Sequence, residues 1–230
     1  MKLLVRDLGV VDYEVVWRRM QAFTEERTEE TCDEFWLVQH PSVYTLGKGA
    51  DSGHVLGAKD IPVIRTDRGG QVTFHGPGQL VIYTLLNVRR LGLGPKELVR
   101  RIEQGIINAL ETMSIRAERV AGAPGVYVEG SKVAALGLRI RKGCSFHGAA
   151  INVEMDLTPF DGINPCGYQG LAVTDLASLS GPQNFQRIYK LMTEQLAQSI
   201  NGDYVLENVT EAPRWVSAKS DSGAVEHGLS

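Results

Sequence analysis

The chain of 230 residues lacks the signatures of several protein classes. It has no basic excess, since 24 Lys and Arg stand against 27 Asp and Glu for a net charge of −3, so its overall charge gives no footprint for nucleic acid. Its three cysteines, Cys32, Cys144 and Cys166, are an odd number without a CxxC pair, which argues against a disulfide scaffold or a structural zinc site. No apolar run reaches the roughly 18 residues that a membrane span requires, and Arg6 and Asp7 come too early for a signal peptide. We therefore expect a cytoplasmic protein without a metal.

The composition is that of an ordinary globular domain. Apolar residues make up 43% of the chain and charged residues 22%, and a chain of this length buries about 70% of its surface on folding. No repeat or linker divides the sequence. We expect one domain over residues 1–210, followed by a frayed polar tail over 211–230 in which Trp215 and Val216 are the possible anchors.

Hydrophobic periodicity predicts helices and strands in an order typical of an α+β fold. Helical spacing predicts three helices, which begin after Asp12, at Pro95 and at Phe185. Strands are expected at residues 35–40, 61–66, 71–75, 80–86, 125–128, 132–141 and 144–153. Residues 156–170, rich in Pro, Gly and Asn, are expected to lack regular structure. Because short turns join the central strands, we expect a mixed, largely antiparallel sheet packed by helices.

A glycine-rich segment at residues 68–79, RGGQVTFHGPGQ, is the first candidate for chemistry. The adjacent Gly69 and Gly70 let backbone N–H groups approach a ligand closely, and Arg68 and His75 offer donors to a carbonyl or an anion. The alternative is a Gly-Gly hairpin beside a hydrogen-bonded core histidine. The segment is neither a Walker loop nor a GxGxxG motif, so binding of a nucleotide phosphate is not indicated.

Lys132 is the second candidate, because it opens the apolar run that continues to Arg139. A lysine desolvated at such a position has a lowered pKa and becomes a usable base. The alternative is a lysine at a hairpin end, exposed to solvent. The small residues Ala134, Ala135 and Gly137 either leave room for a ligand chain or mark tight packing of the sheet.

Cys166 is the third candidate, because it stands on the loop NPCG, framed by proline and glycine. An exposed, backbone-positioned thiol suits a nucleophile, and amides at Gly167 and Gly170 would suit an oxyanion pocket. The alternative is an inert free cysteine, which is usually a small buried hydrophobe. Between the lysine segment and this loop, the strand at 147–153 is expected to approach a neighbour closely at its glycine.

Together these segments resemble the lipoyl(octanoyl) transferase family. The matching stretches are RGGQVTFHGPGQL at 68–80, APGVYV at 123–128, KVAALGLRIRKG at 132–143, FHGAAINV at 146–153 and INPCGY at 163–168, with WLVQHPSVYTLGK before them. They follow the order and spacing of the family and cover most of residues 30–170. The departures are small: Tyr127 stands where the family more often has Trp, and the polar tail is longer.

The resemblance implies an activity, a fold and a set of site residues. It implies a catalytic domain like that of the biotin/lipoate protein ligases and transfer of an octanoyl group from acyl carrier protein to a lysine of lipoyl domains, which occur in 2-oxoacid dehydrogenase complexes and in the glycine-cleavage H protein. It assigns Cys166 as the acyl-thioester nucleophile and Lys132 as its partner, with no cofactor. The implied substrate-binding residues are Arg68, Gly69, Gly70, Gln71, Val72, Thr73, Phe74, His75, Ala135, Leu136, Gly137, Gly148, Ala149 and Ala150.

Three other activities stay open on the sequence. An ATP-dependent lipoate or biotin ligase has a similar fold and needs no cysteine nucleophile. An octanoyl amidotransferase moves the acyl group between lipoyl domains and also uses a cysteine. A module that only binds acylated carriers is the non-enzymatic alternative, and it would form no acyl-enzyme.

Overall fold

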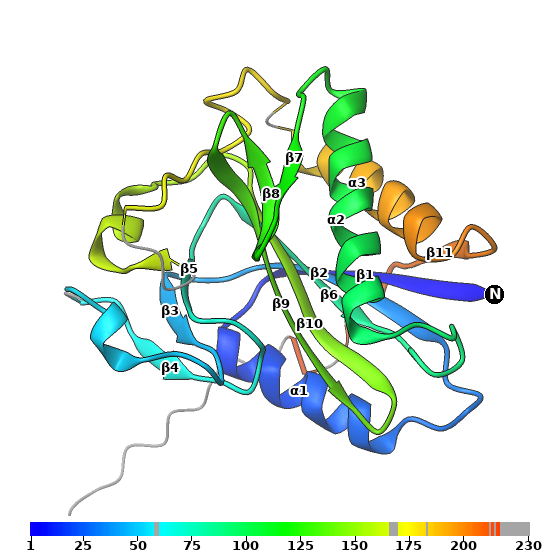
Figure 1. The fold of residues 1–230 in the computed structure, drawn as a ribbon. Helices are drawn as coiled ribbons and strands as arrows, with labels where there is room; N and C mark the ends of the chain where they lie inside the picture. Colours follow the sequence, from blue (N-terminus) through cyan, green and yellow to red (C-terminus); the bar gives the residue numbers. More distant parts are fainter. Residues whose placement is uncertain (58–59, 166–169, 183, 212, 214, 217–230) are drawn as a thin grey trace, which may run out of the picture.

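The fold is a mixed sheet with helices on both faces (Figure 1). The computed structural model describes residues 1–57, 60–165, 170–182, 184–211, 213 and 215–216. In these residues the large sheet has eight strands, in the order β11 (Val205–Val209), β1 (Lys2–Val10), β2 (Asp33–Gln39), β6 (Gln79–Leu85), β10 (Cys144–Asn152), β9 (Ser131–Arg141), β8 (Ala123–Val128) and β7 (Glu118–Val120). Strand β1 runs parallel to β11 and to β2, and the other neighbours are antiparallel. The predicted α+β class is confirmed.

Two tight hairpins build the half of the large sheet formed by β8, β9 and β10. Glu129 and Gly130 turn between β8 and β9, and Lys142 and Gly143 turn between β9 and β10, all with φ between 50° and 80°. Positive φ at both turn residues matches the twist of the flanking strands, as in a type I′ turn. The meander predicted over residues 125–153 therefore forms.

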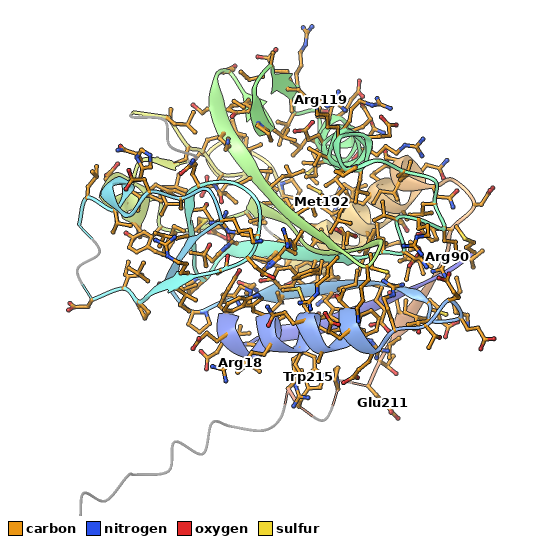
Figure 2. All side chains as sticks on the ribbon, turned by 60° about the horizontal axis from the view of Figure 1, so that its bottom comes forward. Arg18, Arg90, Arg119, Met192, Glu211 and Trp215 are labelled. Atoms are coloured by element: carbon orange, nitrogen blue, oxygen red, sulfur yellow. The ribbon has the colours of Figure 1, made fainter. Side chains whose placement is uncertain are left out.

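Three helices cover the two faces of the large sheet: α1 (Tyr13–Glu26), α2 (Pro95–Thr112) and α3 (Phe185–Ile200). On one face, α2 and α3 lie side by side and share a core with Phe35 and Leu37 of β2. On the other face, α1 packs on Trp36 and Val38 of the same strand. The alternation of strand side chains between faces thus divides the hydrophobic core in two. Figure 2 shows Met192 of α3 inside the molecule, where it is fully buried.

A smaller sheet, in the order β4 (Val63–Arg65), β3 (Val43–Leu46) and β5 (Val72–His75), stands beside the large one. Its core contains Tyr44 and Phe74, with Phe160 from the short 3₁₀ helix η2 (Thr158–Gly162). A second 3₁₀ helix, η1 (Ser52–His54), follows β3. The expectation that residues 156–170 lack regular structure is therefore wrong for η2. Pro159 fits the first turn of that helix, where a backbone N–H has no helical partner.

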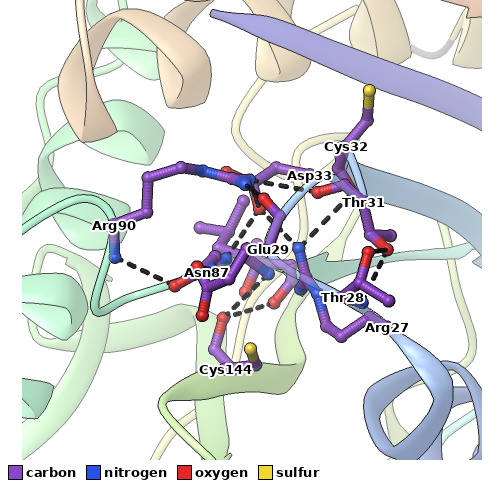
Figure 3. A network of polar contacts seen from close by, with 12 residues as sticks. Arg27, Thr28, Glu29, Thr31, Cys32, Asp33, Asn87, Arg90 and Cys144 are labelled. Carbon is purple, nitrogen blue, oxygen red and sulfur yellow. Dashed lines mark hydrogen bonds and ion pairs between the residues drawn. The ribbon is translucent and has the colours of Figure 1, made fainter.

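A set of polar residues around the buried Asp33 joins the end of α1 to the start of β2 (Figure 3). We call it the Asp33 cluster, and its members are Arg27, Asp33, Asn87, Arg90 and Tyr204. The Oδ1 atom of Asp33 accepts hydrogen bonds from Arg27 at 2.8 Å and from the backbone N–H of Asn87 at 2.7 Å, and Arg90 lies 2.8 Å away. Its Oδ2 accepts a bond of 2.6 Å from the hydroxyl of Tyr204. This fully buried carboxylate is paired and hydrogen-bonded, the condition under which a charge tolerates burial.

The start and the end of the chain follow the predictions less closely. Residues 2–10 form β1, which no prediction included. Asp12 precedes α1 as expected, but its side chain makes no capping hydrogen bond. Trp215 lies against α1 (Figure 2), with its ring 5.5 Å from that of Trp36. Among the described residues, no helix is both long and apolar enough to cross a membrane.

Candidate active site

A cavity of about 160 Å³ opens between the small sheet, α1 and strands β6, β9 and β10. Of the fourteen residues predicted to bind substrate, twelve line it: Arg68, Gly70, Gln71, Val72, Thr73, His75, Ala135, Leu136, Gly137, Gly148, Ala149 and Ala150. Three segments far apart in the sequence therefore meet at one hollow. Most of its wall is aliphatic side chain or glycine, which suits an acyl chain.

The other two predicted residues lie outside this wall. The backbone N–H of Gly69 donates a 2.9 Å hydrogen bond to Leu138 of β9, so Gly69 ties the glycine segment to the sheet. Phe74 is 2% exposed and packs on Tyr44 and Phe160 in the core of the small sheet. Phe74 therefore stabilises the small sheet and does not face the cavity.

Six further residues line the cavity that the site prediction did not include: Tyr13, Val81, Tyr83, Gly122, Pro124 and His147. Pro124 and His147 belong to stretches that carry the family resemblance, so that resemblance could have identified them. Tyr13 and Tyr83 fit the apolar periodicity of a helix and a strand, so the sequence pattern indicates only a core position for them and not a place in the cavity wall.

Residues 68–71 of the glycine segment form a loop that crosses β9 and leads into β5, so the hairpin of the alternative is wrong. Its core histidine is confirmed, since His75 is buried and hydrogen-bonded to Gln79. Strands β4 and β5 both pair with β3 and not with each other. Arg68 is 7% exposed, and its guanidinium donates to the backbone oxygens of Thr45 at 2.6 Å, Gln71 at 2.8 Å and Gly69 at 3.0 Å. Arg68 therefore fixes the path of the loop over the cavity. Gly70 has a φ of 87°, a conformation that disfavours any residue with a Cβ.

The strand glycines have different reasons for being glycine. A Cβ on Gly148 would lie 1.9 Å from the carbonyl oxygen of Ile82 on β6, so a side chain there would break the sheet. A Cβ on Gly137 would lie 3.0 Å from the carbonyl oxygen of Gly69. The predicted close approach of the 147–153 strand is thus confirmed at Gly148, and Gly137 makes room for the loop.

Buried imidazole and phenol groups form what we call the histidine cluster: His40, His75, His147, Tyr13 and Tyr83. His40 bonds to the hydroxyl of Tyr83 at 2.7 Å, and His75 stacks on Tyr13 with ring centroids 5.5 Å apart. Burial, followed by the effect of His40, lowers the pKa of His75 to about 3, and burial lowers that of His40 to about 4. Burial also raises the pKa of Tyr13 to about 12. All these groups are therefore neutral at pH 7, which suits a wall for an uncharged chain.

His147 is held differently, because Asp67 contacts it directly. Its Nε2 lies 2.9 Å from Asp67, which also accepts a bond of 2.7 Å from Trp17 of α1. Burial alone would raise the pKa of Asp67, but the hydrogen bonds from His147 and Trp17 outweigh it and hold the pKa at about 2. The ionised carboxylate selects the tautomer with the proton on Nε2, which leaves Nδ1 as an acceptor. That Nδ1 is buried and has no hydrogen-bond partner in the described part of the chain.

Lys132 is buried, with 3% of its surface exposed, so the alternative of a solvent-exposed lysine is wrong. Its Nζ donates a 3.1 Å hydrogen bond to the carbonyl of Pro124, which lines the cavity, and lies 5.1 Å from the ring centre of Tyr127. Its backbone pairs with the segment at residues 172–174, through bonds of 2.8 and 3.0 Å. The ammonium is therefore held at the edge of the cavity.

The predicted nucleophile, Cys166, lies outside the described residues, as does Gly167. The other two cysteines are described: Cys32 is half-buried and Cys144 is buried. Burial raises the pKa of the Cys144 thiol, which makes it a poor nucleophile at neutral pH. In the described residues, no group of three His, Cys, Asp or Glu side chains is placed to hold a metal ion.

Comparisons with known proteins give matches to sequences and to folds. The chain matches the lipoyl protein ligase A/B catalytic domain over residues 12–197. It is 55% identical to an octanoyltransferase of Xanthomonas campestris pv. campestris (strain B100) over 194 residues, 84% of each chain. It is 51% identical to an octanoyltransferase of Vibrio atlanticus (strain LGP32) over 204 residues, 89% of this chain and 93% of the relative.

Two solved structures have the same fold at low identity. The bi-partite lipoate protein ligase of Thermoplasma acidophilum superposes with a TM-score of 0.73 at 13% identity, over 92% of this chain and 89% of that one. Biotin protein ligase from Aquifex aeolicus superposes with a TM-score of 0.52 at 12% identity, over 87% of this chain and 69% of that one. At these identities the likeness shows the fold alone.

Proposed function

Because the chain belongs to the lipoyl protein ligase A/B catalytic domain family, we propose that it is an octanoyltransferase of protein lipoylation. It takes an octanoyl group from octanoyl-acyl carrier protein and transfers it to one lysine of a lipoyl domain. The acceptors are the lipoyl domains of 2-oxoacid dehydrogenase complexes and the glycine-cleavage H protein. We place the reaction in the cytoplasm. The observation that carries the proposal is the aliphatic cavity with a buried lysine at its edge.

The cavity wall explains how an acyl chain would be held. Val72 and Val81, with Ala135, Ala149 and Ala150, offer aliphatic surface. Burial of each methylene is worth about 0.8 kcal/mol, so an eight-carbon chain gains on the order of 5 kcal/mol. The neutral histidine cluster adds no charge that would need to be desolvated. Because every further methylene would add to this gain, the choice of chain length depends on where the wall of the cavity ends.

In the proposed first step, the thiolate of Cys166 attacks the carbonyl carbon of the donor thioester. The new C–S bond forms as the bond to the carrier sulfur breaks, and the carrier leaves as a thiol once it takes up a proton. The ammonium of Lys132 stabilises the attacking thiolate and supplies that proton. The donor is already activated, so the step needs no ATP.

In the second step, the amine of the target lysine attacks the acyl-enzyme. A C–N bond forms, the C–S bond to Cys166 breaks, and one proton of the amine must be removed. Neutral Lys132 accepts this proton and returns to the ammonium form. The amide product is more stable than either thioester, which drives the cycle forward.

The direct test uses the purified chain, octanoyl-acyl carrier protein and a lipoyl domain in buffer without ATP. We expect the mass of the lipoyl domain to rise by one octanoyl group. Transfer that appears only after ATP and free octanoate are added would identify a ligase instead. Transfer from an octanoylated lipoyl domain, but not from the carrier, would identify an amidotransferase, and a carrier complex without any transfer would indicate a binding module.

Lys132→Arg separates the two roles of the lysine. Arginine keeps a positive charge but does not release its proton near neutral pH. We expect the variant to form the octanoyl adduct roughly tenfold more slowly, because its head group is larger and the leaving carrier thiolate must take its proton from water, and then to fail to pass the group on. Single-turnover mass spectrometry, with a chase of lipoyl domain, measures both steps. A chase that finishes at the wild-type rate would rule out the proton-transfer role, and Lys132→Ala should lose both steps.

A further inference from the structure

We propose that Glu103 is a positioning residue for Lys132, because its carboxylate fixes the peptide bond between Pro124 and Gly125 whose carbonyl holds the lysine ammonium. This inference rests on the proposed function, since it assigns Glu103 to the reaction in which Lys132 takes part. The residue lies on α2, outside every segment that carries the family resemblance.

Glu103 is a buried carboxylate in an otherwise apolar face of α2. It is 6% exposed, and both Ile102, the residue before it, and Ile106, one turn further on, are fully buried. Its Oε2 accepts a 3.1 Å hydrogen bond from Arg119, whose side chain is about one-third exposed and lies at the outside of the molecule (Figure 2). Its Oε1 accepts a 3.0 Å hydrogen bond from the backbone N–H of Gly125. A buried carboxylate is costly unless it is paired, so its placement against one particular peptide is specific.

The peptide that Glu103 binds also contacts Lys132. The carbonyl of Pro124 and the N–H of Gly125 belong to one planar unit, and in a trans peptide they point in opposite directions. The N–H points at Glu103 at 3.0 Å and the carbonyl accepts from the Nζ of Lys132 at 3.1 Å. When Glu103 fixes the N–H, it therefore fixes the direction of the carbonyl.

Gly125 makes this arrangement possible, because the backbone there lies too close to its neighbours for a residue with a side chain. Its φ is 140°, and a Cβ added there would lie 2.9 Å from Cε of Lys132 and 2.8 Å from the carbonyl oxygen of Ala134. The backbone at Gly125 is thus in direct contact with the lysine side chain. A rotation of this peptide would move the carbonyl away from the ammonium.

The charge of Glu103 acts through the same bond. A carboxylate on the N–H polarises the peptide and makes its carbonyl a stronger acceptor, because hydrogen bonds in a chain reinforce one another. Both effects, direction and polarisation, favour the protonated form of Lys132. The structure thus links a charge on α2 to the ammonium at the cavity edge through one peptide bond.

The test compares Glu103→Ala, Glu103→Gln and, as a matched control, Glu97→Gln at a partly exposed glutamate of the same helix. Alanine removes the acceptor, and glutamine keeps an oxygen for the N–H of Gly125 but has no charge. Glu97→Gln removes a charge from α2 that pairs with Arg100 and Arg101 and not with this peptide. The readout is single-turnover formation of the octanoyl adduct, followed by mass from pH 6 to 10, with the KM for the octanoylated carrier and the fraction of folded protein.

We expect Glu103→Ala to form the adduct about 10- to 100-fold more slowly at saturating donor, as for the loss of a charge-assisted hydrogen bond. Its KM should stay near the wild-type value. The alkaline limb of its pH profile should move to lower pH, because the ammonium then loses its proton more easily. Glu103→Gln should recover most of the rate but keep a displaced limb, and Glu97→Gln should stay within about threefold of the wild type in rate.

An unmoved alkaline limb in Glu103→Ala, with a loss of rate that only follows the folded fraction, would overturn the proposal. If that variant does not fold, Glu103→Gln decides alone: a displaced limb supports the role of Glu103 and an unmoved limb overturns it. The wild-type protein in the same assay tests the proposed function separately. If the wild type forms no adduct, the proposed function fails, whatever the variants do.

Discussion

The Asp33 cluster and the histidine cluster lie at opposite ends of the same two elements. Arg27 follows the end of α1 and Asp33 begins β2, whereas Tyr13 begins α1 and His40 follows β2. The first cluster keeps its charges and pairs them around one carboxylate. The second removes charge, because burial without a counter-ion leaves His40 and His75 neutral. Pairing stabilises the fold at one end, and neutrality prepares a wall for an apolar substrate at the other.

The largest expected loss of stability comes from a substitution in the charged Asp33 cluster. Asp33→Ala leaves Arg27 buried without its partner, since the Arg27 side chain is only 3% exposed. We expect the free energy of unfolding to fall by about 3–5 kcal/mol, the usual result of removing one partner from a buried ion pair. Urea denaturation measures this loss. Glu97→Ala, which removes exposed pairs with Arg100 and Arg101, is the control and should leave the midpoint almost unchanged.

The neutral histidines of the histidine cluster make the stability of the protein depend on pH. The pKa values of His75 and His40, about 3 and about 4, lie below their ordinary value of 6.5, so between about pH 4.5 and 5.5 the unfolded chain binds two protons that the folded chain does not. The stability due to this pair is complete above about pH 6.5 and falls as the pH drops, at about 2.7 kcal/mol per pH unit.

His75→Gln tests that slope, because glutamine is neutral and still forms hydrogen bonds. We expect the slope of unfolding free energy against pH to fall by about 1.4 kcal/mol per pH unit relative to the wild type. His54→Gln is the control, since His54 lies on η1 outside the histidine cluster. An unchanged slope in His75→Gln would show that this histidine is charged in the folded protein.

The smallest effect should come from the outer side of α1, between the two clusters. Trp215 packs on Trp36, with Arg19 5.7 Å from its ring centre. We expect Trp215→Ala to lower the free energy of unfolding by about 1 kcal/mol and to leave octanoyl transfer unchanged. Val205→Ala, at a side chain 68% exposed, should change neither. A large loss of octanoyl transfer in Trp215→Ala would contradict this expectation and show that Trp215 contributes to the activity.

Much of the fold could be predicted because its signals are local. Helices α2 and α3 begin at the predicted residues, Pro95 and Phe185, and the two hairpins of β8, β9 and β10 follow from their turn residues. Strand β1 was missed because both of its neighbours, β2 and β11, pair with it in parallel, and parallel pairing leaves no turn in the sequence. Strand β7 has only three residues, of which Glu118 and Val120 are exposed, too few to show a period.

The site divides in the same way. Its glycines and small residues stand in dense motifs, and twelve of those residues prove to line one cavity. Tyr13, Tyr83 and Glu103 were not predicted, because each fits a helix or strand pattern and reaches the site only through tertiary packing. The contact between Lys132 and Pro124 also depends on a φ of 140° at Gly125, which no pattern in the sequence reveals.

The most direct test of the account is to locate the acyl group after reaction with octanoyl-acyl carrier protein and no acceptor. Peptide mapping by mass spectrometry should find one octanoyl group, on Cys166. The adduct should persist in Cys32→Ala and Cys144→Ala and disappear in Cys166→Ala. An octanoyl group on either other cysteine, or an adduct that survives in Cys166→Ala, would contradict the account.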